Sequence, residues 1–402
     1  MASHHESWAR LRRLLWQPPR PHGEQPRARV VSPLELFFDL VVVVLVARAA
    51  HQLAINLSWG GLGEFAAVFT VVWIAWFNAT LHHELHGRDD ARGRSIILLQ
   101  VLALVPLGAF ISDAGGARGV AFAVSAGVLF FLLTLIWFLA ARGDRPEYRH
   151  TSRVAVGGTA VYAAALALSA FLPAEARVLA WGVASVAFLA WFAALLATAT
   201  PVVAAAFTIT SALIERFGLL IIIVLGEVVL GVVDGLSHAT VDGTSLIVAL
   251  VAVVAGFGAW WTYFDFAGHR PPRSERSTVL VWLLTHLPLT AAIAAMGAAM
   301  VSLIEHAHTT DTAAPTAWGL SVSAAIVLGT TALLTTSLQA WREQPGLYKP
   351  LALVCVATAV LTLGLGIAKP PPLLFGLALA GLFGIPWIYA VVRVARHDVP
   401  KS

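Results

Sequence analysis

Long apolar runs alternate with short polar breaks along the chain, from Leu34 to Val394. Each run is close to the roughly 20 residues that an α-helix needs to cross the hydrocarbon core of a bilayer. We therefore predict an all-α polytopic integral membrane protein with twelve transmembrane helices. They are expected at residues 35–56, 62–84, 95–112, 119–141, 154–172, 178–199, 214–236, 245–266, 279–303, 316–340, 350–368 and 373–394.

The composition supports a membrane protein and excludes a soluble globular one. Hydrophobic residues make up 58% of the chain and charged residues 12%, whereas soluble domains carry roughly twice that charge. The single cysteine, Cys355, excludes an internal disulfide and a cysteine-based metal cluster. The chain has no nucleotide-binding loop, nucleophile elbow, kinase motif or His-Glu-x-x-His helix, which argues against an enzyme. We predict no catalytic residue and no cofactor.

Basic residues are distributed unequally between the two sides of the predicted bundle. Of the 26 Lys and Arg residues, 21 fall on segments that share a side with both termini, and only Arg118, Arg177 and Lys369 fall on the other side. Positive charge collects on the cytoplasmic side of membrane proteins, so we expect cytoplasmic N and C termini in the plasma membrane. This orientation also explains the net charge of +4 without a nucleic-acid partner.

The two halves of the chain resemble each other. Residues 34–45 align with residues 214–225, which places Glu35 over Glu215, and a proline recurs in the third and ninth spans. Six spans per half is an even number, so the halves have the same orientation and form two parallel six-helix repeats. The expected parts are a basic tail (1–33), a first repeat (34–199), a second repeat (200–394) and a C-terminal tail (395–402).

Ionisable residues inside the predicted spans concentrate in the first and seventh. The first span carries Glu35, Asp39, Arg48 and His51, and the seventh carries Glu215, Arg216 and Glu227. An ionisable side chain in hydrocarbon is costly unless it is paired or hydrated, so these residues are expected to face the bundle interior. Glu35 and Asp39 are four residues apart, so their carboxylates share one helical face and require a cation or a proton. Arg216 is one available cation.

Arg48 and Glu227 lie at nearly equal depth under the repeat, and we expect them to form an ion pair across the repeat axis. His51 lies one turn above Arg48, and His286 precedes Pro288 in the ninth span; both are candidates for tuning protonation. Two interpretations stay open. The charges line a hydrated pathway, or they are static pairs that hold the helices together.

Two further groups are expected at the membrane boundary. His82, His83 and His86 close the second span, where we expect a solvated cluster rather than a metal site. The run from Trp260 to Phe264 ends the eighth span, where we expect an interfacial aromatic anchor.

Three motifs give the chain a resemblance to a known family. They are Ser32-Pro-Leu-Glu-Leu-Phe-Phe-Asp-Leu40 followed by His51, the stretch from Glu215 to Glu227, and Trp261 to Asp265 combined with His286-Leu-Pro288. In these motifs the chain resembles the bacterial low temperature requirement A family of integral membrane proteins. It differs at Arg48, where a glutamine is common, and at Val228, where a serine often follows the glutamate. Phe37-Phe38-Asp39 is also partly similar to a motif of potassium channels built from two six-helix repeats.

Together these observations favour a secondary transporter or an ion or proton pathway lined by the charges of the first and seventh spans. Glu35 and Glu215 would form the inner gate, and Arg48 and Glu227 the outer gate. The alternative is a membrane scaffold or sensor, linked to cold or membrane stress, that does not transport; an intramembrane enzyme acting on lipid ranks third. Membrane lipid is the expected partner, a small ion or solute the expected cargo, and a homo-oligomer is compatible with the sequence.

Overall fold

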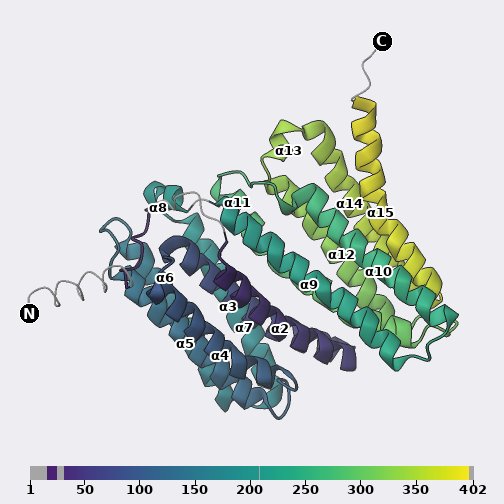
Figure 1. Cartoon of the computed structure of the whole chain (residues 1–402), viewed down its shortest axis with the longest axis horizontal. Helices are drawn as coiled ribbons and strands as arrows, with labels where there is room; N and C mark the ends of the chain where they lie inside the picture. Colours follow the sequence, from purple (N-terminus) through teal and green to yellow (C-terminus); the bar gives the residue numbers. More distant parts are fainter. Residues whose placement is uncertain (1–15, 25–30, 208, 398–402) are drawn as a thin grey trace, which may run out of the picture. The chain divides into compact units, whose positions relative to one another are not determined.

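The structure is a computed structural model that describes residues 16–24, 31–207 and 209–397. The rest of the two predicted tails, residues 1–15, 25–30 and 398–402, lies outside the described residues. Within the described ranges the chain forms fourteen α-helices, α2 to α15, and no strand (Figure 1). The predicted fold class, an all-α polytopic membrane protein, is confirmed.

Each predicted span corresponds to one long helix, and α8 and α13 are two short helices that the hydropathy pattern did not predict. The bounds are α2 (Pro33–Ile55), α3 (Trp59–His86), α4 (Ala91–Ile111), α5 (Gly119–Ala141), α6 (Arg149–Leu168), α7 (Ala174–Ala197), α8 (Pro201–Ala206), α9 (Ser211–His238), α10 (Gly243–Tyr263), α11 (Arg276–Glu305), α12 (Ala314–Ser337), α13 (Ala340–Glu343), α14 (Pro345–Ala368) and α15 (Pro372–His397).

Eleven of the described helices are long and apolar enough to cross a membrane. The helix at the first predicted span, α2, is not among the eleven. It is 23 residues long, about 35 Å at 1.5 Å per residue, and it carries Glu35, Asp39 and Arg48.

The chain divides into two compact units. Unit 1 takes the residues up to Leu45 together with Ala66–Leu213, and unit 2 takes Val46–Phe65 together with the residues from Ile214 onward. The division runs through α2 and α3. The boundary between residues 199 and 200 stays a prediction. The two-repeat arrangement stays a prediction.

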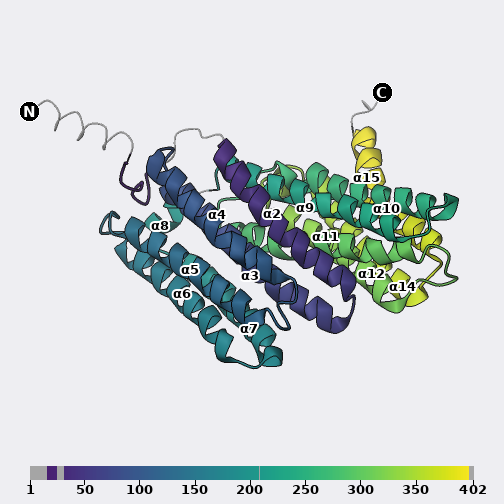
Figure 2. The ribbon, with the colours of Figure 1, turned by 60° about the horizontal axis from the view of Figure 1, so that its bottom comes forward.

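In unit 1, α5 packs against α4 and α6, and α6 packs against α7 (Figure 2). Aromatic side chains fill the contacts: the fully buried Trp181 lies 4.7 Å from Phe122 between ring centroids, and Phe130 lies 4.6 Å from Tyr162. Polar tips in this core are hydrogen-bonded, as buried polar groups require; Trp181 Nε1 donates to Ser169 Oγ at 2.8 Å.

In unit 2, α12 packs against α11 and α14, and α10 packs against α15. Two glycines lie where α9 and α11 pack closely. A Cβ atom built on Gly231 would lie 2.1 Å from the carbonyl oxygen of Gly297, and one built on Gly297 would lie 2.7 Å from the carbonyl oxygen of Glu227. Small residues let transmembrane helices approach closely, so this crossing depends on the absence of side chains.

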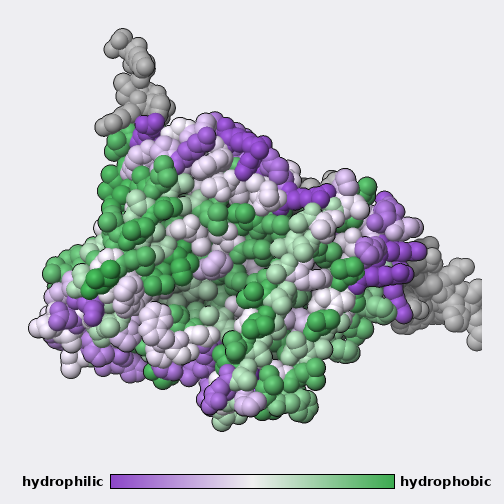
Figure 3. Space-filling view, turned by 180° about the vertical axis from the view of Figure 1, so that it is seen from behind, coloured by the Kyte–Doolittle hydropathy of each residue, from purple (hydrophilic) through white to green (hydrophobic). Residues whose placement is uncertain are grey.

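Apolar side chains remain exposed along the outer faces of the long helices, at the three- to four-residue spacing of a helical stripe. They include Leu98, Leu102 and Val105 on α4, Leu179, Val183 and Val186 on α7, and Leu353, Val356 and Val360 on α14. Hydrophobic side chains cover much of the face drawn in Figure 3, and hydrophilic side chains gather toward its edges. Such faces are stable against lipid rather than water.

Candidate functional site at the end of helix α3

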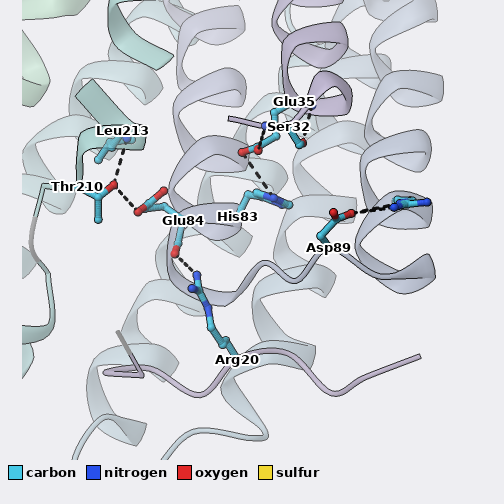
Figure 4. Close-up of polar contacts among 9 residues, drawn as sticks. Arg20, Ser32, Glu35, His83, Glu84, Asp89, Thr210 and Leu213 are labelled. Atoms are coloured by element: carbon cyan, nitrogen blue, oxygen red, sulfur yellow. Dashed lines mark hydrogen bonds and ion pairs between the residues drawn. The ribbon is translucent and has the colours of Figure 1, made fainter. Parts of the chain in front are cut away.

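The first turn of α2 places a buried carboxylate beside an imidazole. Ser32 and Glu35 form a capping box, in which the Ser32 backbone N–H donates to Glu35 Oε2 at 2.9 Å and the Glu35 N–H donates to Ser32 Oγ at 3.3 Å. The second carboxylate oxygen, Oε1, lies 3.6 Å from His83 Nε2 of α3 (Figure 4). The Glu35 carboxylate is buried, at 1% exposure, whereas His83 is partly exposed.

Asp39 lies one turn further along α2 and is fully buried. Its Oδ1 accepts a hydrogen bond of 2.8 Å from Trp76 Nε1, which belongs to α3. Asp39 and Glu35 are thus both buried and both directed to α3, within unit 1. This agrees with the prediction that the two carboxylates share one helical face.

Two of the three histidines that end α3 are buried rather than solvated, contrary to the prediction, and only His83 is partly exposed. His82 and His86 are 5% and 3% exposed, and both rings pack edge-on against Trp137, at 5.2 and 5.4 Å between centroids. The reason is that residues 16–24 fold over the end of α3: the Arg20 backbone N–H donates to the His86 carbonyl at 3.1 Å. A covering segment more than 60 residues away cannot be read from the local pattern.

A fourth histidine, His22, joins this cluster from the covering segment. Its ring stacks on Tyr148 at 4.6 Å and meets the His86 ring at 5.8 Å. Burial, followed by the proximity of His86, lowers the pKa of His22 to about 4, although Asp144 acts in the opposite direction. The His22 imidazole is therefore neutral at pH 7.

Glu84 is a second buried acid at this end of α3, and the sequence reasoning did not single it out. It is 6% exposed, and its Oε1 accepts a hydrogen bond of 2.7 Å from Thr210 Oγ1. Thr210 also accepts from the Leu213 backbone N–H at 3.1 Å and so caps α9, while the Arg20 guanidinium donates to the Glu84 carbonyl (Figure 4). The Glu84 side chain thus holds the start of α9.

Two hollows in unit 1 flank the end of α3. The first, here called the polar pocket, has a cavity volume of about 200 Å³, and its polar lining residues include His82, His83, His86, Asp90, Arg92 and Ser95. The second, the aromatic pocket, has a cavity volume of about 80 Å³ and is lined by Phe77, Trp137, Phe188, Trp191, Phe192 and Phe207, with His22 and Ser152. Through His83, the polar pocket reaches the buried Glu35 carboxylate.

The predicted site residues of unit 2 differ in burial. Glu227 is buried at 7% exposure, but Arg48 and Glu215 are exposed, and no ion pair joins Arg48 to Glu227 in the described part of the chain. Arg216 is buried in α9 at 2% exposure. His51 is exposed, and its Nδ1 lies 3.9 Å from the carboxylate of Asp234.

His286 is buried in α11 with both ring nitrogens engaged. Its Nδ1 donates to the Trp282 carbonyl at 2.6 Å, so in the neutral ring Nε2 accepts from the Tyr263 hydroxyl, at 3.1 Å. Phe217 and Trp282 pack against the imidazole at 4.7 Å. Tyr263 is 1% exposed, so it is part of the interior and not of the interfacial anchor that was predicted for this run.

Comparison with known proteins identifies one family. The model of the family described as bacterial low temperature requirement A protein matches residues 30–385, nearly the whole chain. The match includes the three motifs that carry the resemblance in the sequence. No curated protein and no solved structure matches the chain.

Proposed function

Because the chain belongs to the bacterial low temperature requirement A family, a family of membrane proteins, we propose that it provides a transmembrane pathway for protons or small cations, as a secondary transporter or a channel. The observation that carries this proposal is the buried contact between Glu35 and His83. A carboxylate and an imidazole 3.6 Å apart can exchange a proton, and histidine is the side chain that titrates nearest to neutral pH.

The positions of these groups suit a route from solvent into the bundle. His83 lines the polar pocket and is partly exposed, whereas Glu35 is 1% exposed and Asp39 is fully buried. A proton or hydrated cation in the polar pocket would meet His83 first, then Glu35, and then Asp39 one helical turn deeper. Buried ionisable residues of this kind are expensive in a membrane and commonly mark ion or proton paths.

The test is flux through purified protein in proteoliposomes, with an imposed proton or alkali-cation gradient. Glu35→Gln keeps the capping box, since glutamine also caps, but it cannot ionise. We expect the flux through Glu35→Gln and through His83→Gln to be at least tenfold lower than the wild-type flux. The matched control is Glu175→Gln, an exposed carboxylate in the first turn of α7, which should leave flux unchanged. Wild-type flux retained in Glu35→Gln would contradict the proposal.

The second candidate function is a scaffold or sensor that does not transport, in keeping with the low-temperature requirement in the family's description. It is favoured by the static hydrogen bonds of the buried acids: Glu35 caps α2, Asp39 accepts from Trp76, and Glu84 accepts from Thr210. This function predicts no flux in the wild-type protein, together with lower melting temperatures when Asp39 or Glu84 is neutralised.

A further inference from the structure

Three side chains of the type that binds metals converge on one point in unit 1, from segments far apart in the sequence. His22 comes from the covering segment, His86 is the last residue of α3, and Asp144 lies in the connection between α5 and α6. One ligand atom from each lies within 4.8 Å of the other two. The three residues are 7%, 3% and 3% exposed.

Each imidazole has one ring nitrogen for which no hydrogen bond is found among the described residues. His86 Nδ1 donates to the Arg20 carbonyl at 2.8 Å, so its lone pair is on Nε2. His22 Nε2 is buried and has no hydrogen-bond partner. Buried polar atoms are almost always hydrogen-bonded, so this nitrogen is available to a ligand. Ligating histidines characteristically donate their other N–H to a carbonyl, as His86 does.

Asp144 is held in place by its own hydrogen bonds. Its Oδ1 accepts from the His22 backbone N–H at 2.9 Å, and its Oδ2 accepts from the Ser152 hydroxyl at 2.5 Å. A carboxylate has about four lone-pair sites, so capacity for a metal remains.

The covering segment is shaped to keep His22 at this point. The His22 ring stacks on Tyr148, and the next residue, Gly23, has a φ of 83°, in the region that favours glycine. A Cβ atom on Gly23 would lie 2.4 Å from the Tyr148 hydroxyl oxygen. Only glycine therefore allows both this turn and the contact with Tyr148.

We propose that His22, His86 and Asp144 bind one divalent transition-metal ion, with zinc as the ion that fits best. Two imidazoles and one carboxylate form a ligand set that zinc uses with a fourth position left for water. Imidazole ligands favour zinc, copper, iron or nickel over magnesium and calcium. Ligands of a tetrahedral zinc ion lie roughly 3.4 Å apart, so the side chains need to close by little more than 1 Å.

The proposed site borders the two pockets of unit 1, and a bound ion would tie three segments together. His86 lines the polar pocket and His22 lines the aromatic pocket, so two of the three ligands each border a hollow. A bound ion would fasten residues 16–24 to α3 and to the connection between α5 and α6. This inference is independent of the proposed pathway, since it requires no transport.

The test uses the full chain, produced without a polyhistidine tag, stripped with a chelator and then incubated with Zn²⁺ alone. Elemental analysis after removal of free metal should give one zinc per chain, and Zn²⁺ should raise the melting temperature. His22→Gln, His86→Gln and Asp144→Asn should each weaken zinc binding at least tenfold and abolish the thermal shift. His22 lies outside every helix, so its variant is the one expected to fold normally, as circular dichroism would verify.

The matched control is His82→Gln. His82 is buried one turn before His86, and its Nε2 also has no hydrogen-bond partner, but it is not one of the three converging ligands. We expect His82→Gln to retain the zinc and the thermal shift. The proposal is overturned if the wild-type protein holds no stoichiometric zinc, if folded His22→Gln binds zinc like the wild type, or if His82→Gln loses as much zinc as His86→Gln.

Discussion

The carboxylate of Glu35 lies 3.6 Å from the imidazole of His83, and the same carboxylate closes the capping box of α2. One side chain therefore serves both the start of a helix and a buried acid–imidazole contact. The two roles can be separated experimentally, because glutamine preserves the capping hydrogen bonds and removes the charge.

Capping by Glu35 predicts a difference between two substitutions. Glu35→Ala removes the hydrogen bond to the Ser32 N–H and should lower the free energy of unfolding by about 1 kcal/mol relative to Glu35→Gln. Thermal melts of both variants in the same detergent measure the difference. Equal melting temperatures would show that the hydrogen bond accepted by the Glu35 side chain does not contribute to stability.

The hydrogen bond between Trp76 and Asp39 predicts that Trp76→Phe is destabilising. Removing the indole donor takes a partner from a fully buried carboxylate, at a cost of about 1–3 kcal/mol. Trp73 provides the control, because it is also buried in α3 but its Nε1 has no hydrogen-bond partner. In chemical unfolding, Trp73→Phe should lower the free energy of unfolding clearly less than Trp76→Phe does. The same loss in both variants would assign the effect to packing alone.

The crossing of α9 and α11 predicts that an alanine substitution on α9 is destabilising at Gly231 but not at Gly226. Gly231→Ala places a methyl group 2.1 Å from the Gly297 carbonyl oxygen, so the helices must separate. We expect the free energy of unfolding to fall by about 3 kcal/mol, the upper end of what overpacking commonly costs. The yield of folded protein and the melting temperature should both be lower. Gly226→Ala, also on α9, meets no atom within 4 Å and should behave like the wild type.

The capping box at the start of α10 predicts a pH dependence. The backbone hydrogen bond from Ser245 is the main cause that lowers the pKa of Asp242, and His308 also contributes, its Nε2 lying 3.0 Å from the carboxylate. A carboxyl whose pKa is lower in the folded state stabilises the fold above its ordinary pKa of 3.8, and this stabilisation is lost as the pH falls through the folded value. Asp242→Ala should therefore melt earlier than the wild type at pH 7, and the gap should narrow toward pH 3. A gap that widens at low pH would contradict this assignment.

The long helices could be predicted from the sequence because each one coincides with a long apolar run. Each predicted span lies on one helix, and the hydropathy pattern missed only the short α8 and α13 among the described helices. The burial of Glu35 and Asp39 was also predictable, since carboxylates four residues apart in an apolar helix need a common interior face.

The candidate site was less predictable because it depends on contacts distant in the sequence. Nothing near His86 indicates that residues 16–24 cover it, and nothing near Asp144 indicates that it meets His22. Tyr263 lies in a run typical of an interfacial aromatic anchor. Its hydroxyl is instead hydrogen-bonded to His286 inside the bundle. The Ser32-x-x-Glu35 spacing is the one local signal that would have identified the capping role of Glu35 in advance.

The most direct test of the proposed pathway is the rate at which an imposed pH gradient collapses in proteoliposomes that contain the wild-type protein or Glu35→Gln. The account predicts collapse well above that of empty liposomes for the wild type, and at least tenfold slower collapse for a Glu35→Gln variant that melts like the wild type. Equal rates for the two proteins, or a wild-type rate no faster than that of empty liposomes, would contradict it.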